Sequence, residues 1–366
     1  MAIRFTSPPE QICILRLSAL GDISHTLPIV RTLQRHWPQT KITWVIGKLE
    51  HQLVCDIPDI EFIIFDKNQG LGAYRDLRRN MRKRRFDVLL HMQMSIRASL
   101  ASLLIPAEIR LGFDKQRAKD LQWLFTNRRI AYKPEQHVID SFFGFTEALG
   151  IPEHVLEWDI PIPDEAREYA AGTLDPERKA LIISPCSSMS YRNWSAEGYA
   201  AVADYAADTH GLQVILCGGP SAIEREYGRR IGELCSHRPL DLIGQTGIKQ
   251  LVALLAQAEL LIAPDSGPAH LATAVGTPVI GLYAATNPDR ARPYLSADLV
   301  VNKYPEAIRD QYGKSVAELP WGTRARAASA MARIRPEDVI AKLDQHLSTR
   351  PNVKRQDISK DEQVFE

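Results

Sequence analysis

Short apolar runs alternate with longer amphipathic segments along most of the chain. The runs at 11–17, 86–92 and 180–185 are rich in aliphatic and β-branched residues, which favours buried strands. Segments that follow such runs, for example 23–37 and 195–209, carry apolar residues at helical spacing. An order of strand, helix and strand is typical of parallel sheets with helices on their faces. The pattern therefore predicts an α/β fold built from doubly wound sheets.

The alternation is interrupted at the proline-rich segment 152–163, and the same order of elements restarts after it. A chain of 366 residues is also long for one hydrophobic core. We therefore predict two domains that face each other, an N-terminal one at 1–163 and a C-terminal one at 164–335. The polar and charged segment 348–366 is expected to be disordered.

The sequence APDSGPAH at 263–270 lies between two apolar runs and is the clearest candidate for a binding loop. Asp265, Ser266 and Gly267 turn the chain, and a helix is expected to follow. A helix start carries unpaired N–H groups and partial positive charge, which suit a phosphate group. Asp265 and His270 flank this position. The loop is therefore predicted to bind a nucleoside diphosphate.

A second polar loop follows the first predicted strand. Gly21 allows a close approach there, and Asp22 lies at or near the start of the next helix. Aspartate is among the best helix-capping residues and is also a common general base, so both interpretations stay open. His25 follows three residues later and can share a helix face with Asp22. A histidine at such a place is more often a hydrogen-bonding partner than a reacting group.

Two further loops in the second half carry polar side chains after predicted strands. Ser187, Ser188 and Arg192 are suited to binding phosphate oxygens, although a serine-rich turn would also explain the two serines. Glu224 follows a Gly-Gly pair. Its carboxylate could reach a ribose hydroxyl, and a charge on a helix surface explains it equally well.

Basic residues of the first half form two groups. Those between 78 and 85 are best explained as a solvated helix face, which could also meet anionic headgroups. Arg97 and Arg117 follow later strands and would suit an acceptor that carries carboxylate or phosphate groups. Nucleic acid is a poor partner, because the net charge is only +1 and aromatic residues do not alternate with the basic ones.

Several other classes of protein are disfavoured. There is no GxSxG motif, no Walker lysine loop and no spacing of histidines or cysteines that suits a metal. The five scattered cysteines favour reduced thiols in the cytoplasm. No signal peptide and no membrane-spanning apolar run is recognisable.

Three segments together resemble glycosyltransferase family 9, the lipopolysaccharide heptosyltransferases. They are LRLSALGDISHTLP at 15–28, SSMSYRNW at 187–194 and APDSGPAHLATAVGTPVIGLYAATNP at 263–288. The resemblance extends from about residue 13 to 347, and the branch that adds the first heptose, heptosyltransferase I, is the most similar. It implies a GT-B fold with the donor in the C-terminal domain and the acceptor in the N-terminal one. It also implies that a helix at 336–347 crosses back to the first domain.

The activity implied by this resemblance is transfer of L-glycero-D-manno-heptose from ADP-heptose to a Kdo residue of the inner core, with inversion and without a metal. The acceptor would be Kdo-lipid A at the cytoplasmic face of the inner membrane. Asp22 corresponds to the family's catalytic base. The donor-binding positions are Ser187, Ser188, Arg192, Asp265, Ser266, Gly267 and His270, with Glu224 for the ribose. The acceptor-binding positions are Gly21, His25, Arg97 and Arg117.

In this family a lysine is common at the position of Arg192, and Pro220 stands where the ribose-binding acid is usual. Other functions remain open on the residues alone. These are a heptosyltransferase of type II or III, a nucleotide-sugar epimerase of the same fold, and a nucleotide-sugar-binding protein without chemistry.

Overall fold

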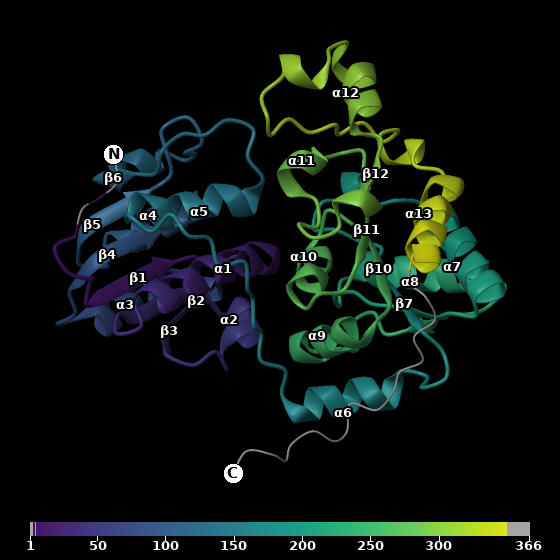
Figure 1. Cartoon of the computed structure of the whole chain (residues 1–366), viewed down its shortest axis with the longest axis horizontal. Coiled ribbons are helices and arrows are strands. Elements are labelled where there is room, and N and C mark those ends of the chain that lie inside the picture. The colour runs from purple at the N-terminus through teal and green to yellow at the C-terminus, as the bar shows by residue number, and fades with distance from the viewer. Residues whose placement is uncertain (1–2, 4, 350–366) are drawn as a thin grey trace.

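The computed structural model describes residue 3 and residues 5–349 and contains two parallel six-stranded sheets (Figure 1). The first sheet has the order β3-β2-β1-β4-β5-β6. Its strands are β1 (Gln11–Leu15), β2 (Lys41–Gly47), β3 (Ile60–Phe65), β4 (Phe86–His91), β5 (Ala107–Gly112) and β6 (Arg128–Arg129). The helices of this half are α1 (Leu20–His36), α2 (Lys48–Val54), α3 (Leu71–Met81), α4 (Ile96–Ser102) and α5 (Val138–Ala148).

The second sheet repeats this plan with the order β12-β11-β10-β7-β8-β9. Its strands are β7 (Ala180–Ile183), β8 (Gln213–Leu216), β9 (Leu240–Asp241), β10 (Leu260–Pro264), β11 (Val279–Tyr283) and β12 (Val301–Asn302). The helices are α6 (Asp164–Thr173), α7 (Ala196–His210), α8 (Ala222–Leu234), α9 (Ile248–Gln257), α10 (Gly267–Ala274), α11 (Pro288–Ala291), α12 (Tyr304–Tyr312) and α13 (Pro336–Thr349). The prediction of two doubly wound α/β halves is confirmed.

Each sheet has one point at which the chain reverses its direction of winding. In the first sheet this point lies between β1 and β4, and in the second it lies between β10 and β7. Loops that leave neighbouring strands in opposite directions at such a point leave a crevice, which is where ligands bind in open α/β sheets. Asp22, in the first turn of the helix after β1, and Asp265, in the loop after β10, therefore lie at the two places where this topology favours a site.

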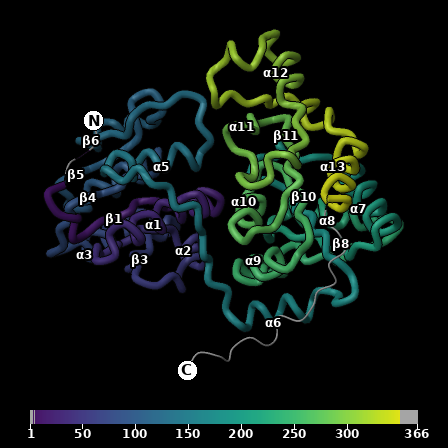
Figure 2. Tube along the Cα trace, viewed as in Figure 1, coloured from purple at the N-terminus to yellow at the C-terminus, as the bar shows by residue number. Residues whose placement is uncertain are grey.

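The two halves meet through helices α1 and α10, whose first turns face each other (Figure 2). A β-carbon placed on Gly267 would lie 3.7 Å from Cβ of Leu20, so the backbones approach closely there. Both helices begin directly after a central strand whose apolar residues are fully buried. The cores of the two sheets therefore fix the two loops opposite each other.

The expectation that the helix at 336–347 crosses back to the first domain is wrong. Helix α13 packs on α7 and along strands β11 and β12, and its Val339 and Leu343 belong to the core of the second sheet (Figure 1). Asp344 accepts hydrogen bonds from Tyr205 and His210 of α7. The apolar face of this helix is therefore buried on the domain that precedes it. Residues 350–366 of the segment expected to be disordered lie outside the described residues, and its first two residues end α13.

Candidate active site

Asp22 lies in the first turn of α1, and its charge acts on Arg290 of the second half. Its carboxylate accepts a hydrogen bond from the backbone N–H of Ala19, with an N···O distance of 3.2 Å. It also forms an ion pair with Arg16, whose side chain is only 9% exposed, whereas that of Asp22 is 38% exposed. Asp22 therefore caps the helix and is open to a ligand at the same time, so the two interpretations of this residue are compatible.

Arg16, which the sequence did not single out, holds Asp22 in place. Its guanidinium donates a hydrogen bond to the backbone carbonyl of Met92, beyond the end of β4, and lies over the ring of Phe142 at 5.4 Å. The side chain that orients the candidate base is thus anchored by two other elements of the first half. A carboxylate held in this way loses little conformational freedom when a substrate arrives.

Asp265, Arg192 and His270 come together at the start of α10, as predicted from the sequence. Nη1 of Arg192 lies 3.1 Å from Oδ2 of Asp265, and Nε2 of His270 lies 3.7 Å from Oδ1. Burial raises the pKa of Asp265, but the hydrogen bond with His270 and the charge of Arg192 outweigh it and hold this pKa below its ordinary value. This carboxylate is therefore an anion that is already matched by its neighbours.

Ser266, directly before the first residue of α10, has a buried hydroxyl without a hydrogen-bond partner among the described residues. A buried polar group that lacks a partner is costly, so such a group in a loop at a sheet switch point indicates a place for a ligand. The first turn of a helix leaves backbone N–H groups without intrahelical partners, here those of Gly267 and Ala269, and together with Ser266 they form a set of donors. This arrangement suits the phosphate group that the sequence predicted here.

Ser187 and Ser188 lie on the loop between β7 and the short 3-10 helix η3 (Ser190–Arg192). The backbone N–H of Ser187 donates to Oδ1 of Asn193 at 2.8 Å, which fixes the loop. Ser188 is exposed. The serines thus share a loop with Arg192, which itself contacts Asp265.

Glu224 holds the glycine loop at the start of α8 through its carboxylate. Its carboxylate accepts hydrogen bonds from the backbone N–H of Gly219 at 2.8 Å and from the hydroxyl of Ser221 at 2.7 Å. These bonds close the glycine loop onto the first turn of α8. Both oxygens of the carboxylate are engaged by the protein itself, and its assignment to the ribose stays a prediction.

His25 lies inside the contact between the halves. Its ring centroid is 4.3 Å from that of His270 and 6.1 Å from that of His137. Burial, together with the neighbouring His270 and His137, lowers the pKa of His25 well below its ordinary value. His137 accepts the N–H of Ile139 and donates to the carbonyl of Arg292 at 2.9 Å, which ties α5 to the second half.

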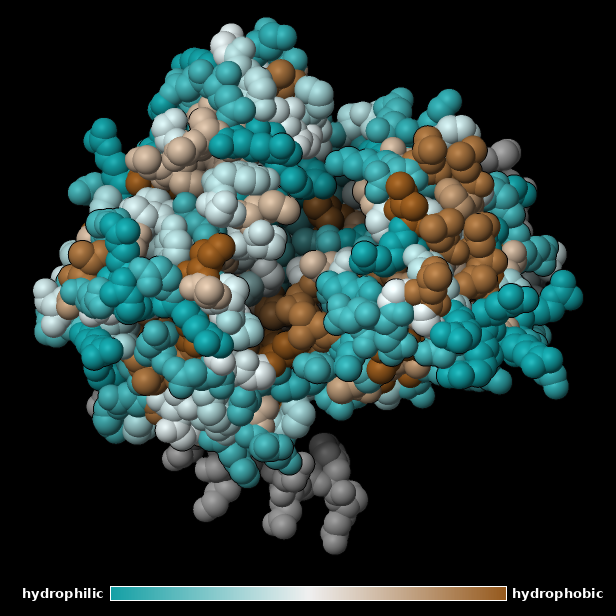
Figure 3. All heavy atoms as spheres, turned by 180° about the vertical axis from the view of Figure 1, so that it is seen from behind, coloured by the Kyte–Doolittle hydropathy of each residue, from teal (hydrophilic) through white to brown (hydrophobic). Residues whose placement is uncertain are grey.

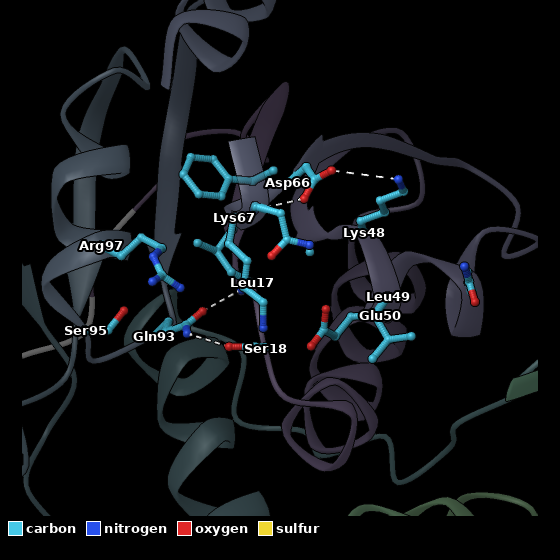
Figure 4. A pocket seen from close by; sticks show the side chains of 14 residues that line it. Leu17, Ser18, Lys48, Leu49, Glu50, Asp66, Lys67, Gln93, Ser95 and Arg97 are labelled. Carbon is cyan, nitrogen blue, oxygen red and sulfur yellow. Dashed lines mark hydrogen bonds and ion pairs between the residues drawn. The ribbon is translucent and has the colours of Figure 1, made fainter. Parts of the chain in front are cut away.

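A pocket of about 300 Å³ opens at the carboxyl edge of the first sheet (Figure 4). Arg97 lies on one side of it and Lys48 and Glu50 on the other, with Lys67 between them. Burial raises the pKa of Glu50 above its ordinary value. His25 is not part of this lining, whereas Arg97 is, so only Arg97 of these two has the position expected of an acceptor-binding residue.

Arg117 does not face this pocket as a free cation. Its guanidinium forms an ion pair with Asp114 and donates to Gln136 at 2.9 Å, to Ser141 at 2.7 Å and to the carbonyl of Ala131 at 2.8 Å. These bonds fasten the long loop that precedes α5. In this structure Arg117 therefore fastens the protein's own chain, and its assignment to acceptor binding stays a prediction.

Two further arginines of the second half, Arg290 and Arg324, lie near the candidate donor loop and were not among the predicted site residues. The charge of Arg290, on α11, interacts with Asp265, Arg324, Asp22 and Arg192, and burial lowers its pKa. Arg324 pairs with Thr286 in an isolated bridge, and its guanidinium lies 3.4 Å from the hydroxyl of Tyr191. The charges of Arg192 and Arg290 thus both act on the buried carboxylate of Asp265, and Arg324 lies close enough to Arg290 for their charges to interact. Among the described residues, no group of three or more His, Cys, Asp or Glu side chains is arranged to hold a metal.

The sequence did contain an indication that Arg290 lies near the donor loop, because Arg290 follows β11 at the same edge of the sheet as Asp265. For Arg324 the sequence contained no such indication, since this residue lies in the irregular segment 313–333.

Comparison with known proteins identifies the family of this chain. Residues 74–318 match the model of glycosyltransferase family 9 (heptosyltransferase). The chain is 43% identical over 339 residues to the lipopolysaccharide core heptosyltransferase OpsX of Haemophilus influenzae, and the match covers 93% of this chain and 97% of that protein.

Two solved structures share the fold. A family 9 glycosyltransferase of Veillonella parvula has a TM-score of 0.79 at 23% identity, and the match covers 96% of this chain and 100% of that one. The ADP-heptose lipopolysaccharide heptosyltransferase II of E. coli has a TM-score of 0.71 at 20% identity, with 93% and 99% covered. The chain belongs to glycosyltransferase family 9 and is a heptosyltransferase of the lipopolysaccharide core with the two-domain GT-B fold.

Proposed function

We propose that the protein transfers L-glycero-D-manno-heptose from ADP-heptose to a Kdo residue of the inner core of lipopolysaccharide. The observation that carries this proposal is the position of Asp22, which is partly exposed and paired with Arg16, close to the start of α10 with its unpartnered Ser266 hydroxyl. The solved E. coli relative is named for ADP-heptose, and the relative from Haemophilus influenzae is named for the lipopolysaccharide core.

The donor's diphosphate would bind at the first turn of α10. The free N–H groups, the hydroxyl of Ser266 and the guanidinium of Arg192 supply hydrogen-bond donors there. Asp265 holds Arg192 in place through its ion pair. The sugar would then extend from this loop toward α1.

Asp22 would act as the general base. It would accept the proton of the acceptor hydroxyl while the oxygen of that hydroxyl attacks the anomeric carbon and the bond to ADP breaks. One displacement of this kind inverts the anomeric centre. Arg16 supports the step by keeping the carboxylate in one orientation.

The leaving ADP gains negative charge as the bond breaks. Arg192 and Arg290, with Arg324 close to Arg290, would stabilise that charge, as a divalent ion does in other transferases. We therefore propose a reaction that needs no metal.

The acceptor would enter the pocket lined by Arg97 and Lys67, whose positive charges suit the carboxylate of a Kdo residue. Because such an acceptor is carried on lipid A, we propose that the protein acts at the cytoplasmic face of the inner membrane. None of the helices in the described part of the chain is long and apolar enough to cross a bilayer.

The test is a transfer assay with the purified full chain, ADP-heptose and two acceptors, Kdo-lipid A and the same lipid already carrying one heptose. Mass spectrometry of the products should show one added heptose on Kdo-lipid A, and NMR should show the inverted anomer. Transfer only to the heptosylated lipid would instead assign the protein to a later step of core assembly. Binding of ADP without transfer to either lipid would contradict an enzymatic role.

A further inference from the structure

Helix α4 presents its large apolar side chains to solvent. Ile96, Leu100 and Leu103 are 62%, 45% and 61% exposed. Their spacing of four and three residues places them on one face of the helix. The opposite face, which packs on the sheet, is made of the small residues Ala98, Ser99, Ala101 and Ser102. This is the reverse of the pattern expected for a helix that only covers a core.

A second apolar segment lies beside α4. Leu121 and Leu124, at the 3-10 helix η2 (Gln122–Leu124), are 58% and 60% exposed. The guanidinium of Arg110 joins the two segments, because it donates to the carbonyl of Ser102 at 2.6 Å and to that of Phe125 at 3.1 Å. Figure 3 shows a continuous hydrophobic patch on the N-terminal domain, seen from behind.

Positive charges surround these segments. The side chain of Lys115 lies over the ring of Trp123 at 5.7 Å, and Arg129 donates to the carbonyl of the same Trp123. The exposed cations near the two segments form no ion pair within the described part of the chain, and they are Arg97, Lys115, Lys119, Arg128 and Arg129. These five cations outnumber the exposed acids of the same stretch of chain, Glu108 and Asp120, so the apolar surface lies in a region of net positive charge.

The apolar face also continues into the candidate acceptor pocket. Ser95, which caps α4, and Arg97 line this pocket, and Ile96 between them is exposed (Figure 4). A substrate with its sugar in the pocket would have its lipid part on the side of α4. By contrast, the basic helix α3 has part of its charge neutralised, since Arg79 pairs with Asp76 and the nearby Arg84 with Glu61.

We propose that Ile96, Leu100, Leu103, Leu121 and Leu124, with the cations around them, form a docking surface for an anionic lipid bilayer. Leucine and isoleucine side chains enter the boundary between headgroups and acyl chains, while lysine and arginine contact anionic headgroups. The link to the acceptor pocket rests on the proposed function, whereas binding to lipid does not. Docking would hold the candidate acceptor pocket next to the bilayer surface, where the sugar of a lipid acceptor lies.

The test is sedimentation of the full chain with vesicles of phosphatidylcholine alone or mixed with phosphatidylglycerol. The double variant Leu100→Gln with Leu103→Gln removes apolar area at two exposed positions, where the fold does not depend on it. We expect wild-type protein to bind the anionic vesicles, and the double variant to bind them about tenfold or more weakly. The matched control, Ile223→Gln with Leu234→Gln, changes two comparably exposed residues of α8 in the other domain and should bind as wild type does.

Equal binding of the wild type and the α4 variant would overturn the proposal. It would also be overturned if the wild type failed to bind vesicles and formed a dimer that the α4 variant breaks, as measured by light scattering, because the surface would then contact a second copy. Vesicle binding needs no turnover, so a protein that docks but transfers no heptose would contradict the proposed function and leave the docking surface intact.

Discussion

The ring of His270 lies directly against Gly21. A β-carbon placed on Gly21 would be only 2.8 Å from Cδ2 of this ring, closer than real side chains approach. Gly21 belongs to α1 and His270 to α10, so this contact joins the loop of the candidate base to the loop of the donor site. The two halves can close to this distance only because residue 21 has no side chain.

Gly21→Ala should hold the two halves apart. The added methyl group would force His270 to move, which we expect to lower the free energy of unfolding by about 1–3 kcal/mol and heptose transfer by about tenfold or more. Small-angle scattering should show a larger radius of gyration. Gly172→Ala, in α6 where nothing lies within 4 Å of the added carbon, is the control and should be neutral or slightly stabilising. Unchanged transfer in Gly21→Ala would show that this contact is not needed.

Asp22→Asn keeps an oxygen that can cap α1 but removes the charge that would accept a proton. We expect turnover to fall by about 10²–10⁴-fold, because general-base catalysis contributes about this much. Calorimetry should show ADP binding close to that of the wild type. Asp76→Asn, which removes an exposed carboxylate on α3 paired with Arg79, should retain full turnover. Near-normal turnover of Asp22→Asn would refute its role as the base.

Arg290→Gln removes one of the two guanidinium groups whose charges act on Asp265 of the donor loop. If Arg290 stabilises charge on the leaving ADP, kcat should fall by about 10²–10³-fold, and the Kd for ADP should rise much less. Arg290→Lys should restore part of the rate, since it restores the charge. Arg309→Gln, at an exposed position of α12, is the control for loss of an arginine in this region. An equal loss in ADP affinity and kcat would assign Arg290 to ground-state binding instead.

Acid should destabilise the fold through its buried histidines. Burial lowers the pKa of His91 and of His137 to about 3 from an ordinary value of 6.5. Below 6.5 the unfolded chain binds protons that the folded chain does not, so stability is lost as the pH falls. The free energy of unfolding should decrease by up to about 1.4 kcal/mol per pH unit for each histidine. Urea unfolding between about pH 7 and about pH 5 measures this slope, and His91→Gln should make it shallower. A flat profile in the wild type would contradict the prediction.

Chelation should leave heptose transfer intact. If arginines supply the positive charge at the leaving group, excess EDTA should not change kcat, and added Mg²⁺ should not raise it. The assay uses protein dialysed against the chelator beforehand. Activity that disappears on chelation and returns with one particular metal would contradict the metal-free reaction.

The sequence alone determined the features that depend on neighbouring residues. Its alternation of apolar runs and amphipathic segments specified two doubly wound sheets, because strand and helix periods are local. It also placed Asp22 and Asp265 after strands, and Asp265 and His270 on one loop and helix start. The helix α1 was predicted to begin at residue 23 and begins at Leu20, three residues earlier. Asp22 therefore lies inside its first turn, where its carboxylate accepts the N–H of Ala19.

Only the tertiary structure decided what each face and each charge meets. Arg117 looked like a free cation, but Gln136 and Ser141, about twenty residues away, engage it. Arg324 was brought close to Arg290 by the path of an irregular segment that has no periodicity. The apolar face of α13 could have packed on either domain, and it packs on the second one. The large apolar side chains of α4 are exposed to solvent instead of packing on the sheet. Periodicity shows which residues share a face, but the surface that this face contacts depends on how the whole chain packs.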